Sequence, residues 1–481
     1  AYYMSQSHIS TLFDESPNRF AQFGFTQDNL LLDLSKQRIT DETLRLLIDL
    51  AKERGLSTWI EALFNGEHIN DSEDRPALHT ALRTPKGVKL EVDGVEIIEE
   101  VHQNLESMEA IVTKIHSGQW RGFTGHSINT VVNIGVGGSD LGPLMACKAL
   151  AEHAPESVRN LNVHFVSSMD GSQLADLLSH LNPARTLFVI SSKSFTTIDT
   201  LANANTAKEW LKQASDDASE AILVSRHFIG VSASPDKALK WGIPKANQLA
   251  FWDWTGGRYS MWSTIGLPIA LKLGMKGFRE ILAGAHAMDT HFRETPLEQN
   301  LPVLIAMVGI WNINFLNINA HAILPYDGRL SHLPAYLEQL EMESNGKSVT
   351  RKGEATTYNT CPILWGEVGT NAQHAFYQLL HQGTESVMCD FIVAAKRYHD
   401  TDNSELKHQH QLNTTLLLDE LTPHTFGQII AMYEHKVFVQ SVIWDINPFD
   451  QWGVELGKKV ATTLLDALTP DASIEAFDAS T

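Results

Sequence analysis

The sequence predicts an α/β protein with two domains, each containing a mainly parallel sheet flanked by helices. Short apolar runs recur from residue 130 onward, and each is followed by small or polar residues and then by a longer helix-like segment. Such alternation is typical of parallel strands joined by crossover helices. The runs form two groups along the chain, and 481 residues exceed the usual size of one domain. The length fits two or three domains, and the two groups of runs favour two.

The expected elements follow in order along the chain. The first hundred residues read mostly as helix. The strands are predicted in two groups, at 130–134, 162–166, 186–190 and 227–231, and then at 321–325, 361–365 and 387–392. Between the groups lies the most apolar stretch, residues 301–316, which Asn312 and Asn314 interrupt. It is too short to span a bilayer comfortably, so we expect a buried helix and no membrane segment.

The charge balance excludes one large class of function. The formal net charge is −20, from 37 basic and 57 acidic residues. A broad nucleic-acid surface is therefore not expected, because such surfaces need an excess of Lys and Arg. The charge does not exclude one small basic pocket for a single phosphate.

The cysteines and the N-terminal residues indicate the compartment. Cys147, Cys361 and Cys389 are far apart and lack CxxC spacing, so neither a disulfide framework nor a zinc site is expected. Free cysteines favour a reducing compartment. The first residues, AYYMSQSHIS, have neither a basic start nor an apolar core, so they are not a secretory signal. We therefore predict a cytoplasmic protein.

A glycine-rich segment, residues 135–143, follows the first predicted strand. Ligands bind beyond the carboxyl ends of parallel strands, and glycines let the backbone approach a ligand closely. The segment is not a dinucleotide motif, because Asp140 stands where the third glycine would fall, and it lacks the Gly-Lys-Ser/Thr of a P-loop. Its local pattern supports an anion-binding turn and a tight turn without a ligand equally well.

The segment SSKSFTT at 191–197 follows the third predicted strand and precedes a helix predicted from Thr197 to about Leu211. Its five hydroxyls and one ammonium exceed what a turn requires. Hydroxyls, helix N–H groups and a lysine charge suit a phosphate monoester. Thr197 and Thr200 are three residues apart, so both can face the same way. We expect a phosphate site here rather than a solvated helix cap.

Two charged residues, Arg258 and Glu343, lie next to predicted turns and are candidates for a catalytic role. Two glycines precede Arg258, whose guanidinium either stabilises negative charge on a substrate or forms a structural ion pair. Residues 334–341 are predicted to form a short helix before the turn signal Asn345-Gly346, which places Glu343 at a helix-to-turn junction.

Spacing alone does not single out Glu343. Glu338, Glu341 and Glu343 crowd together, and most of them are expected to be surface carboxylates. His374 follows a Gly-rich turn and suits acid–base work near neutral pH, but it is one of 21 histidines. His408 and His410 lack metal-site spacing and are expected on a polar helix face.

A last polar segment precedes the predicted C-terminal helix. Gln451 and Lys458 are seven residues apart and therefore lie on one helical face. Lys458 is off the apolar stripe of that helix, and a solvated lysine is the commoner case.

Together these segments resemble the glucose-6-phosphate isomerase family, also called phosphoglucose isomerase. The resemblance runs through most of the chain in family order. It rests on EDRPALHTALR at 73–83, the glycine loop at 135–142, SSKSFTT at 191–197, GGRYS at 256–260, MESNGK at 342–347, GTNAQHAFYQL at 369–379 and FDQWGVELGK at 449–458. Each motif alone is weak, whereas six or more in order leave little room for chance.

The resemblance implies a fold, an activity and an assembly. The activity is the reversible interconversion of glucose 6-phosphate and fructose 6-phosphate in glycolysis and gluconeogenesis, without a metal or an organic cofactor. The fold has two sugar-isomerase (SIS)-type domains, a smaller one at 96–272 and a larger one at 1–95 plus 273–481. The assembly is a homodimer in which His374 reaches the neighbouring subunit's site.

The resemblance also implies residue roles, carried over by motif position. Glu343 looks like the base that moves a proton between C1 and C2 through an enediol. His374 looks like the ring-opening acid–base group with Lys458 as its partner, and Arg258 like the group that stabilises the enediolate. The phosphate loop corresponds to Ser192, Lys193, Ser194, Thr197 and Thr200, and further substrate contacts to Gly138, Ser139, Gly257, Gln339 and Gln451.

Some positions depart from the family pattern. Thr255 replaces a usual aliphatic residue, Ser194 a usual Thr, and Ile198-Asp199 a usual Gln-Glu. These changes bear on substrate affinity more than on the reaction, because none is a proposed acid or base.

Two alternatives stay open. One is an isomerase of the same fold that acts on a mannose or amino-sugar phosphate. The other is a regulatory module that binds a sugar phosphate without turnover. Glu343, His374 and Lys458 together argue against the second, because phosphate binding needs none of them.

Overall fold

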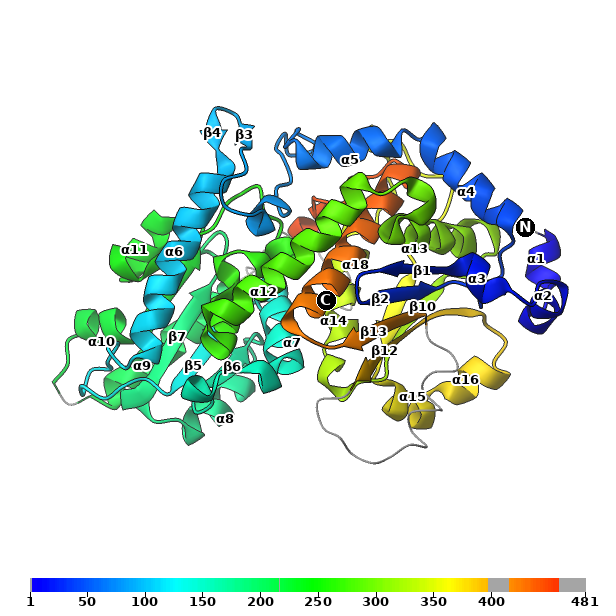
Figure 1. Ribbon diagram of the computed structural model, residues 1–481. Helices are drawn as coiled ribbons and strands as arrows, with labels where there is room; N and C mark the ends of the chain where they lie inside the picture. The colour runs from blue at the N-terminus through cyan, green and yellow to red at the C-terminus, as the bar shows by residue number, and fades with distance from the viewer. Residues whose placement is uncertain (1, 216, 397–414, 458–481) are drawn as a thin grey trace, which may run out of the picture.

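The computed structural model describes residues 2–215, 217–396 and 415–457. Figure 1 shows two sheet-containing lobes, with the long helices α12 (Leu267–Glu294) and α18 (Pro423–Trp444) between them. The predicted α/β class with two helix-flanked sheets is confirmed.

The smaller sheet is entirely parallel, with strand order β6-β5-β7-β8-β9. Its strands are β5 (Thr130–Ile134), β6 (Asn162–Val166), β7 (Thr186–Ser191), β8 (Phe228–Ser232) and β9 (Gln248–Ala250). Every residue of β5, β7 and β8 is buried, as expected for central strands covered by helices on both faces. Four of these strands match the predicted runs to within one residue. The fifth, β9, was not predicted, because three residues carry no clear periodicity.

The larger sheet is mixed, with strand order β1-β2-β13-β12-β10-β11. Its parallel strands are β10 (Ala320–Pro325), β11 (Ile363–Gly366), β12 (Val387–Lys396) and β13 (Leu416–Glu420). The hairpin of β1 (Gly24–Gln27) and β2 (Leu30–Asp33) joins the edge of β13 in antiparallel fashion. The three predicted strands of this sheet are confirmed, with shifted boundaries.

The expectation of a mostly helical N-terminal region was incomplete. The region does contain helices, but it also contributes β1 and β2 to the larger sheet and the small hairpin of β3 (Glu91–Val92) and β4 (Val95–Glu96). The β1–β2 hairpin turns at Asp28, whose φ of 49° is left-handed. These strands are short, and their stability comes from pairing with a distant strand, β13, rather than from local sequence.

The remaining helices connect and cover the strands. Those of the N-terminal region are α1 (Tyr2–Gln6), α2 (Ile9–Glu15), α3 (Arg19–Phe23), α4 (Asp41–Glu53), α5 (Leu56–Phe64) and α6 (Ile97–His116). Those of the small-sheet region are α7 (Leu141–Ala149), α8 (Ser172–His180), α9 (Ile198–Gln213), α10 (Glu220–His227) and α11 (Pro235–Trp241). Those of the large-sheet region are α13 (Leu301–Ile310), α14 (Leu333–Glu338), α15 (Gly369–Ala375) and α16 (Tyr377–Gln382).

The apolar stretch at 301–316 forms a buried helix, as predicted. All ten residues of α13 are buried, and the chain continues as a π-helical turn at Trp311–Phe315. Asn312, which interrupts the apolar pattern, is itself buried and donates to the Gln37 side chain at 3.3 Å. None of the helices in the described ranges is long and apolar enough to cross a membrane.

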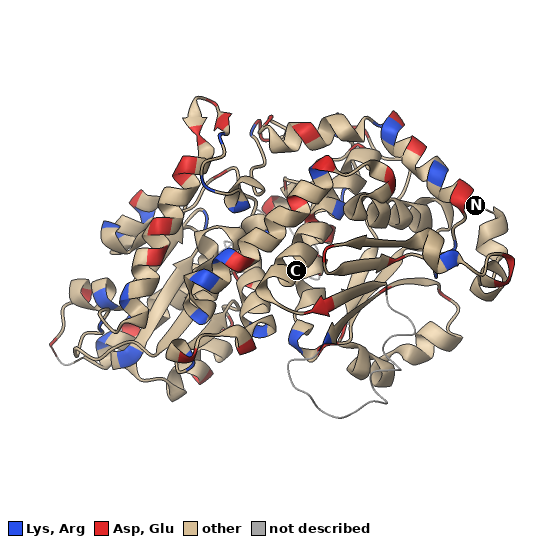
Figure 2. Ribbon diagram, viewed as in Figure 1, with Lys and Arg blue, Asp and Glu red and all other residues tan. Residues whose placement is uncertain are grey.

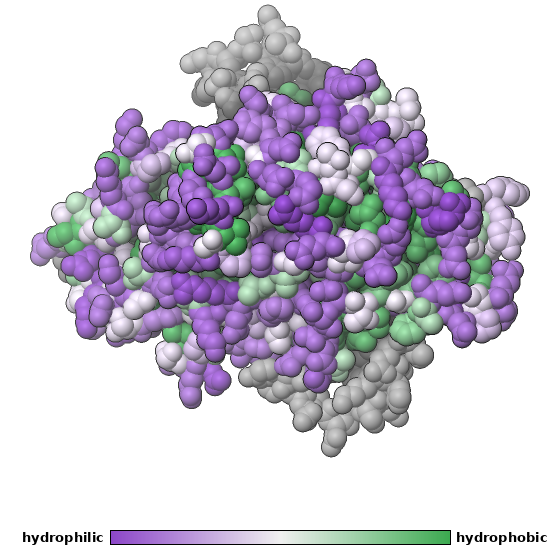
Figure 3. Space-filling model, turned by 45° about the horizontal axis from the view of Figure 1, so that its top comes forward, coloured by the Kyte–Doolittle hydropathy of each residue, from purple (hydrophilic) through white to green (hydrophobic). Residues whose placement is uncertain are grey.

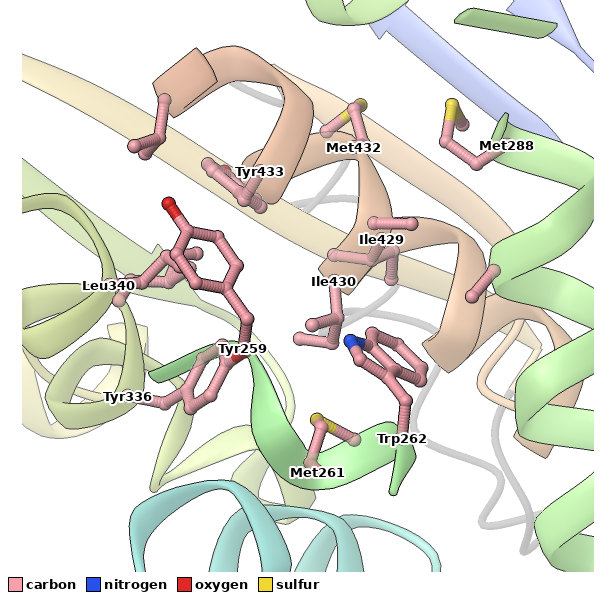
Figure 4. Packing of buried hydrophobic residues seen from close by; sticks show 14 of the residues in the cluster. Tyr259, Met261, Trp262, Met288, Tyr336, Leu340, Ile429, Ile430, Met432 and Tyr433 are labelled. Carbon is pink, nitrogen blue, oxygen red and sulfur yellow. The ribbon is translucent and has the colours of Figure 1, made fainter. Parts of the chain in front are cut away.

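A single large core joins the two lobes. In Figure 4 aromatic residues of the 3₁₀ helix η7 (Gly257–Trp262) gather with Tyr336 of α14 and with apolar residues of α18. Helices α12 and α18 approach closely because Gly284 and Gly427 lie at their contact. A Cβ on either glycine would fall within about 2.1 Å of a carbonyl oxygen on the other helix.

Charged residues are distributed unevenly. Figure 2 shows them along outer helices such as α4 and α6, while α13 carries none. Hydrophilic side chains cover most of the face in Figure 3, with apolar groups between them. Helix α18 also carries titratable residues in its interior, because Glu434, His435 and Lys436 are all buried in its middle.

Candidate active site

The candidate site forms where the strand order of the small sheet reverses. From β5 the chain passes to β6 on one side, whereas β7, the other neighbour of β5, leads to β8 on the opposite side. The loops that leave β5 and β7 therefore diverge, and ligands commonly bind at such a point in parallel sheets. The glycine loop at 135–143 and the SSKSFTT loop at 191–197 are these two loops.

The glycine loop packs directly on the segment that carries Arg258. A Cβ on Gly138 would lie 2.0 Å from the carbonyl oxygen of Gly257, so no side chain fits between them. Gly137 has a φ of 59°, which favours glycine, and a Cβ there would lie 3.0 Å from the Gln339 amide nitrogen. Three predicted substrate contacts from separate segments, Gly138, Gly257 and Gln339, therefore lie together.

Gly138→Ala is expected to destabilise the fold by about 1–3 kcal/mol, because the added methyl must displace the Gly257 backbone. Gly257→Ala is the matched control for stability, since its Cβ would meet no atom within 4 Å. Urea unfolding of both variants measures the difference. Equal unfolding free energies for the two variants would contradict the close approach.

Ser139 and Asp140 complete the glycine loop. The Ser139 carbonyl accepts a 3.0 Å hydrogen bond from the Asn133 side chain, which ties the loop to β5. Asp140 is buried, and burial raises the pKa of its carboxyl to about 6. Its negative charge is therefore lost in mildly acidic solution, where an exposed Asp would stay ionised.

The SSKSFTT loop presents hydroxyls at the start of α9, the helix predicted from Thr197. Thr197 is the residue before the helix, and its hydroxyl lies 3.4 Å from that of Ser192. The hydroxyls of Ser194 and Thr196 are 2.7 Å apart, and Thr200 is buried within the first turn. The loop is suited to an anion because hydroxyls gather beside the unpaired N–H groups of a sixteen-residue helix.

The Lys193 ammonium connects this loop to the segment before Arg258. Its Nζ donates hydrogen bonds of 2.8 and 3.2 Å to the carbonyls of Asp253 and Thr255. Burial, and next the nearby Arg75 charge, lower the pKa of Lys193 to about 8. The lysine therefore holds two loops of the site together, a contact that its sequence motif did not predict.

Arg258 is 1% exposed and makes several polar contacts within the chain. Its guanidinium donates to Ser344 Oγ at 2.6 Å, to Gln451 Oε1 at 3.1 Å and to the Pro448 carbonyl. Its Nη1 also lies 3.4 Å from a carboxylate oxygen of Glu343. Arg258 therefore connects the segment after Glu343 to the segment that carries Gln451. It also places a positive charge beside the candidate base.

Glu343 is the last residue of η12 (Gln339–Glu343), a π-helical turn that continues α14. The predicted short helix before Asn345-Gly346 is confirmed as α14 together with η12. The side chain of Glu343 is 19% exposed, and its Oε2 accepts a 2.9 Å hydrogen bond from Gln339. The carboxylate is therefore fixed by an amide on one side and by Arg258 on the other.

The expectation that most of the neighbouring carboxylates are surface groups was wrong for Glu341. Glu341 is 2% exposed and forms a 2.7 Å ion pair with the buried Lys436 of α18. Glu338 is half-buried, and burial raises the pKa of its carboxyl. The three carboxylates therefore occupy different environments, because successive helical residues face different sides of the turn.

Lys347 is a site residue that its local sequence pattern does not single out. Its ammonium donates to four backbone carbonyls, those of Glu343, Ser344, Asn447 and Asp450. Burial, and next the Arg258 charge, lower the pKa of Lys347 to about 8. Lys347 thus fastens the turn after Glu343 to the segment before Gln451. Its only signal in the sequence was its place in the motif at 342–347.

His374 lies apart from these residues. It is exposed on α15, and no described hydrogen bond or ion pair within the chain joins it to Glu343 or Arg258. Lys458, His408 and His410 lie outside the described residues. The structure thus brings together the glycine loop, the SSKSFTT loop, Arg258, Gln339, Glu343 and Gln451, but it does not add His374.

A pocket opens beside this cluster. Its walls include Arg75, His79, Lys193, Gly256, Tyr259 and Gln451. Arg75 and His79 come from the motif at 73–83, whose local pattern suggested no role. These residues are far from the other site residues in sequence, and the tertiary fold brings them to the pocket.

Comparison with known proteins identifies the family. The family model described as phosphoglucose isomerase matches residues 33–415 and 409–481. The chain belongs to the phosphoglucose isomerase family. It is 55% identical to glucose-6-phosphate isomerase 2 of Chromohalobacter salexigens, over 99% of this chain and 93% of that protein. It is 51% identical to the glucose-6-phosphate isomerase of Hydrogenovibrio crunogenus, over 99% and 95% of the two chains.

Solved structures agree with this assignment. A glucose-6-phosphate isomerase from Chlamydia trachomatis superimposes with a TM-score of 0.85 at 30% identity, covering 98% of this chain and 96% of that one. A hypothetical protein from Thermus thermophilus shares the fold, with a TM-score of 0.66 at 22% identity over 88% and 96% of the two chains. The family resemblance recognised from the motifs is confirmed.

Proposed function

We propose that this chain catalyses the reversible interconversion of glucose 6-phosphate and fructose 6-phosphate through ring opening and an enediol intermediate. The observation that carries the proposal is the Glu343 carboxylate held 3.4 Å from the Arg258 guanidinium. This pair lies in a site that also contains a hydroxyl-rich helix start. Relatives more than half identical to this chain bear the name of that activity.

The phosphate of the substrate is proposed to bind at the start of α9. Hydroxyls of Ser192, Ser194, Thr197 and Thr200 and the backbone N–H groups there donate to its oxygens. Lys193 contributes positive charge nearby while holding the loop in place. Binding the remote phosphate fixes the reacting carbons, which converts the proton transfer into an effectively unimolecular step.

The proton transfer is proposed to run through Glu343. Its carboxylate removes the proton from C2 of the open-chain aldose, and the C–H electron pair forms the C1–C2 double bond as the carbonyl oxygen becomes an oxyanion. Arg258 stabilises that negative charge. The C2 hydroxyl proton then passes to the C1 oxygen, and the negative charge moves to the C2 oxygen. Glu343 returns its proton to C1 as the C2 carbonyl forms, which gives the ketose and regenerates the carboxylate. Gly138, Ser139, Gly257, Gln339 and Gln451 position the sugar.

Ring opening is proposed to use His374 and Lys458. The exposed position of His374, away from Glu343 of its own chain, supports a homodimer in which His374 completes the neighbouring subunit's site. Such a protein would act in glycolysis and gluconeogenesis in the cytoplasm.

The proposed domains are 96–272 and 1–95 plus 273–481. The whole small sheet falls within the first range. The boundary lies two residues before Gly274, where α12 has non-helical backbone angles.

A coupled assay with fructose 6-phosphate, mannose 6-phosphate and glucosamine 6-phosphate tests the substrate. We expect turnover of fructose 6-phosphate to exceed that of the other two sugar phosphates by at least about a hundredfold. A site that hydrogen-bonds one arrangement of hydroxyls leaves polar groups unpaired when a different sugar binds. Binding of fructose 6-phosphate without any turnover would support the regulatory alternative and overturn the proposal. Deuterium uptake at C2 in D₂O would separate enediol chemistry from hydride transfer.

A further inference from the structure

A buried ion pair joins η12, the turn that carries Glu343, to helix α18. Lys436 Nζ is 2.7 Å from Glu341 Oε2, and the two side chains are 1% and 2% exposed. Lys436 comes from the middle of α18, the long helix between the lobes. The pair therefore connects η12 to the rigid centre of the molecule.

Glu341 and Glu343 project from opposite sides of η12. Residues two apart on a helical turn point in roughly opposite directions, so one carboxylate faces the core when the other faces the site. Glu341 is buried against α18, and Glu343 is partly exposed beside Arg258. The direction of Glu343 is thus coupled to the direction in which Glu341 is held.

The other end of the turn is also fastened to α18. Asn345 donates from its side chain to the Val437 carbonyl at 3.1 Å and to Gln440 Oε1 at 3.3 Å. Glu343 therefore lies between two polar anchors, at residues 341 and 345, that both contact one helix. π-helical turns are rare and are frequently found at functional sites, so contacts that hold one in place deserve a functional explanation.

Stability alone does not account for the ion pair. Removing two charges from water costs several kcal/mol each, so an apolar pair of similar volume is often equally or more stable. An ion pair fixes direction and distance, which an apolar contact does not. Fixed direction and distance are useful here, because the Glu343 carboxylate, two residues after Glu341, needs a defined position.

We propose that Glu341 and Lys436 are positioning residues that hold Glu343 at the substrate, an inference that rests on the proposed function. Together they set the position of the base without contacting the substrate. Loss of the pair lets η12 shift, and a misplacement of about 1 Å at a reacting group costs roughly a hundredfold in rate.

The test uses Lys436→Met, Glu341→Leu and the double variant that combines them. Each single variant leaves one unpaired buried charge and is expected to lose stability. The double variant removes both charges and is expected to regain much of the thermal stability. In all three, kcat for fructose 6-phosphate is expected to fall at least about tenfold while KM changes less than about threefold, because the phosphate loop is untouched.

Asp289→Asn is the matched control. Asp289 is also a buried carboxylate paired with a buried cation beside α18, at 2.6 Å from Arg83, but it does not contact η12. This variant is expected to lose stability and keep its kcat. The split between kcat and KM supplies the second readout, because a displaced Glu343 slows the proton transfer while the phosphate loop still binds the substrate.

Two results would overturn the proposal. One is a folded double variant with unchanged kcat, and the other is an equal loss of kcat in Asp289→Asn. Failure of the proposed function is distinguishable, since the unchanged protein would then show no isomerisation of any sugar phosphate in the panel.

Discussion

Glu343→Gln is expected to lower kcat for fructose 6-phosphate by about a hundredfold to ten-thousandfold, the usual contribution of a general base. The amide has the size of the carboxylate, so it can still accept the hydrogen bond from Gln339 and lie beside Arg258. An amide, however, cannot take a proton from C2. KM and the affinity for fructose 6-phosphate are therefore expected to change little.

Steady-state kinetics and calorimetric titration of fructose 6-phosphate measure the two effects separately. Glu338→Gln is the matched control, because Glu338 is a carboxylate five residues earlier whose side chain has no described hydrogen bond or ion pair with Arg258 or Glu343. That variant is expected to keep its kcat. Near-native turnover by Glu343→Gln would show that another group moves the proton.

Arg83→Met is expected to destabilise the fold by about 3–5 kcal/mol, the usual cost of breaking a buried ion pair from one side. Arg83 is completely buried and binds both oxygens of Asp289, at 2.6 and 2.7 Å, and also Glu434. Trp262 donates to the same Glu434 at 2.7 Å. Removing the guanidinium leaves two carboxylates buried in the core that joins the lobes.

The loss of stability in Arg83→Met is expected to grow as the pH rises. In the intact protein, burial opposes ionisation of Asp289, but the Arg83 charge outweighs burial and lowers the pKa of Asp289 to about 2. Burial raises the pKa of Glu434 to about 7. Without Arg83 the folded-state pKa of Asp289 rises above its unfolded value, and that of Glu434, which is already raised, rises further. Stability of the variant is then present at low pH and is lost as the pH rises through those raised pKa values.

Urea unfolding at pH 5 and pH 8 measures this difference. Arg45→Met is the control, because Arg45 is an exposed arginine whose pairs with Glu42 and Asp49 lie at the surface. Exposed pairs contribute at most about 1 kcal/mol, so its effect is expected to be small at both pH values. A loss below about 1 kcal/mol in Arg83→Met would contradict a structural role for the buried network.

Strand positions were predictable because the signal is local. Residues 130–134 and 186–190 are continuous apolar runs, and a strand buried on both faces needs such a run. Strands β1 and β2 were missed for the opposite reason. Their strand state depends on pairing with β13, which lies almost four hundred residues away in the sequence.

Parts of the candidate site were also predictable. Hydroxyls and glycines placed just after apolar runs identified the two loops at the carboxyl ends of β5 and β7. Lys193 shows the limit of such reasoning, because its motif suggested a phosphate ligand, whereas its ammonium donates to the carbonyls of Asp253 and Thr255. The direction of a long side chain depends on which acceptors the fold brings within reach.

The sequence by itself determined the α/β class, most of the strands, the two polar loops at the carboxyl ends of β5 and β7 and, through its ordered motifs, the family. These features depend on local periodicity and on residue types at short spacing. Only the tertiary structure decided which of Glu338, Glu341 and Glu343 faces Arg258 and which faces Lys436. Their partners lie about ninety residues away along the chain and become neighbours only when α18 and η7 pack against the turn, because burial and electrostatic contact depend on distance in space.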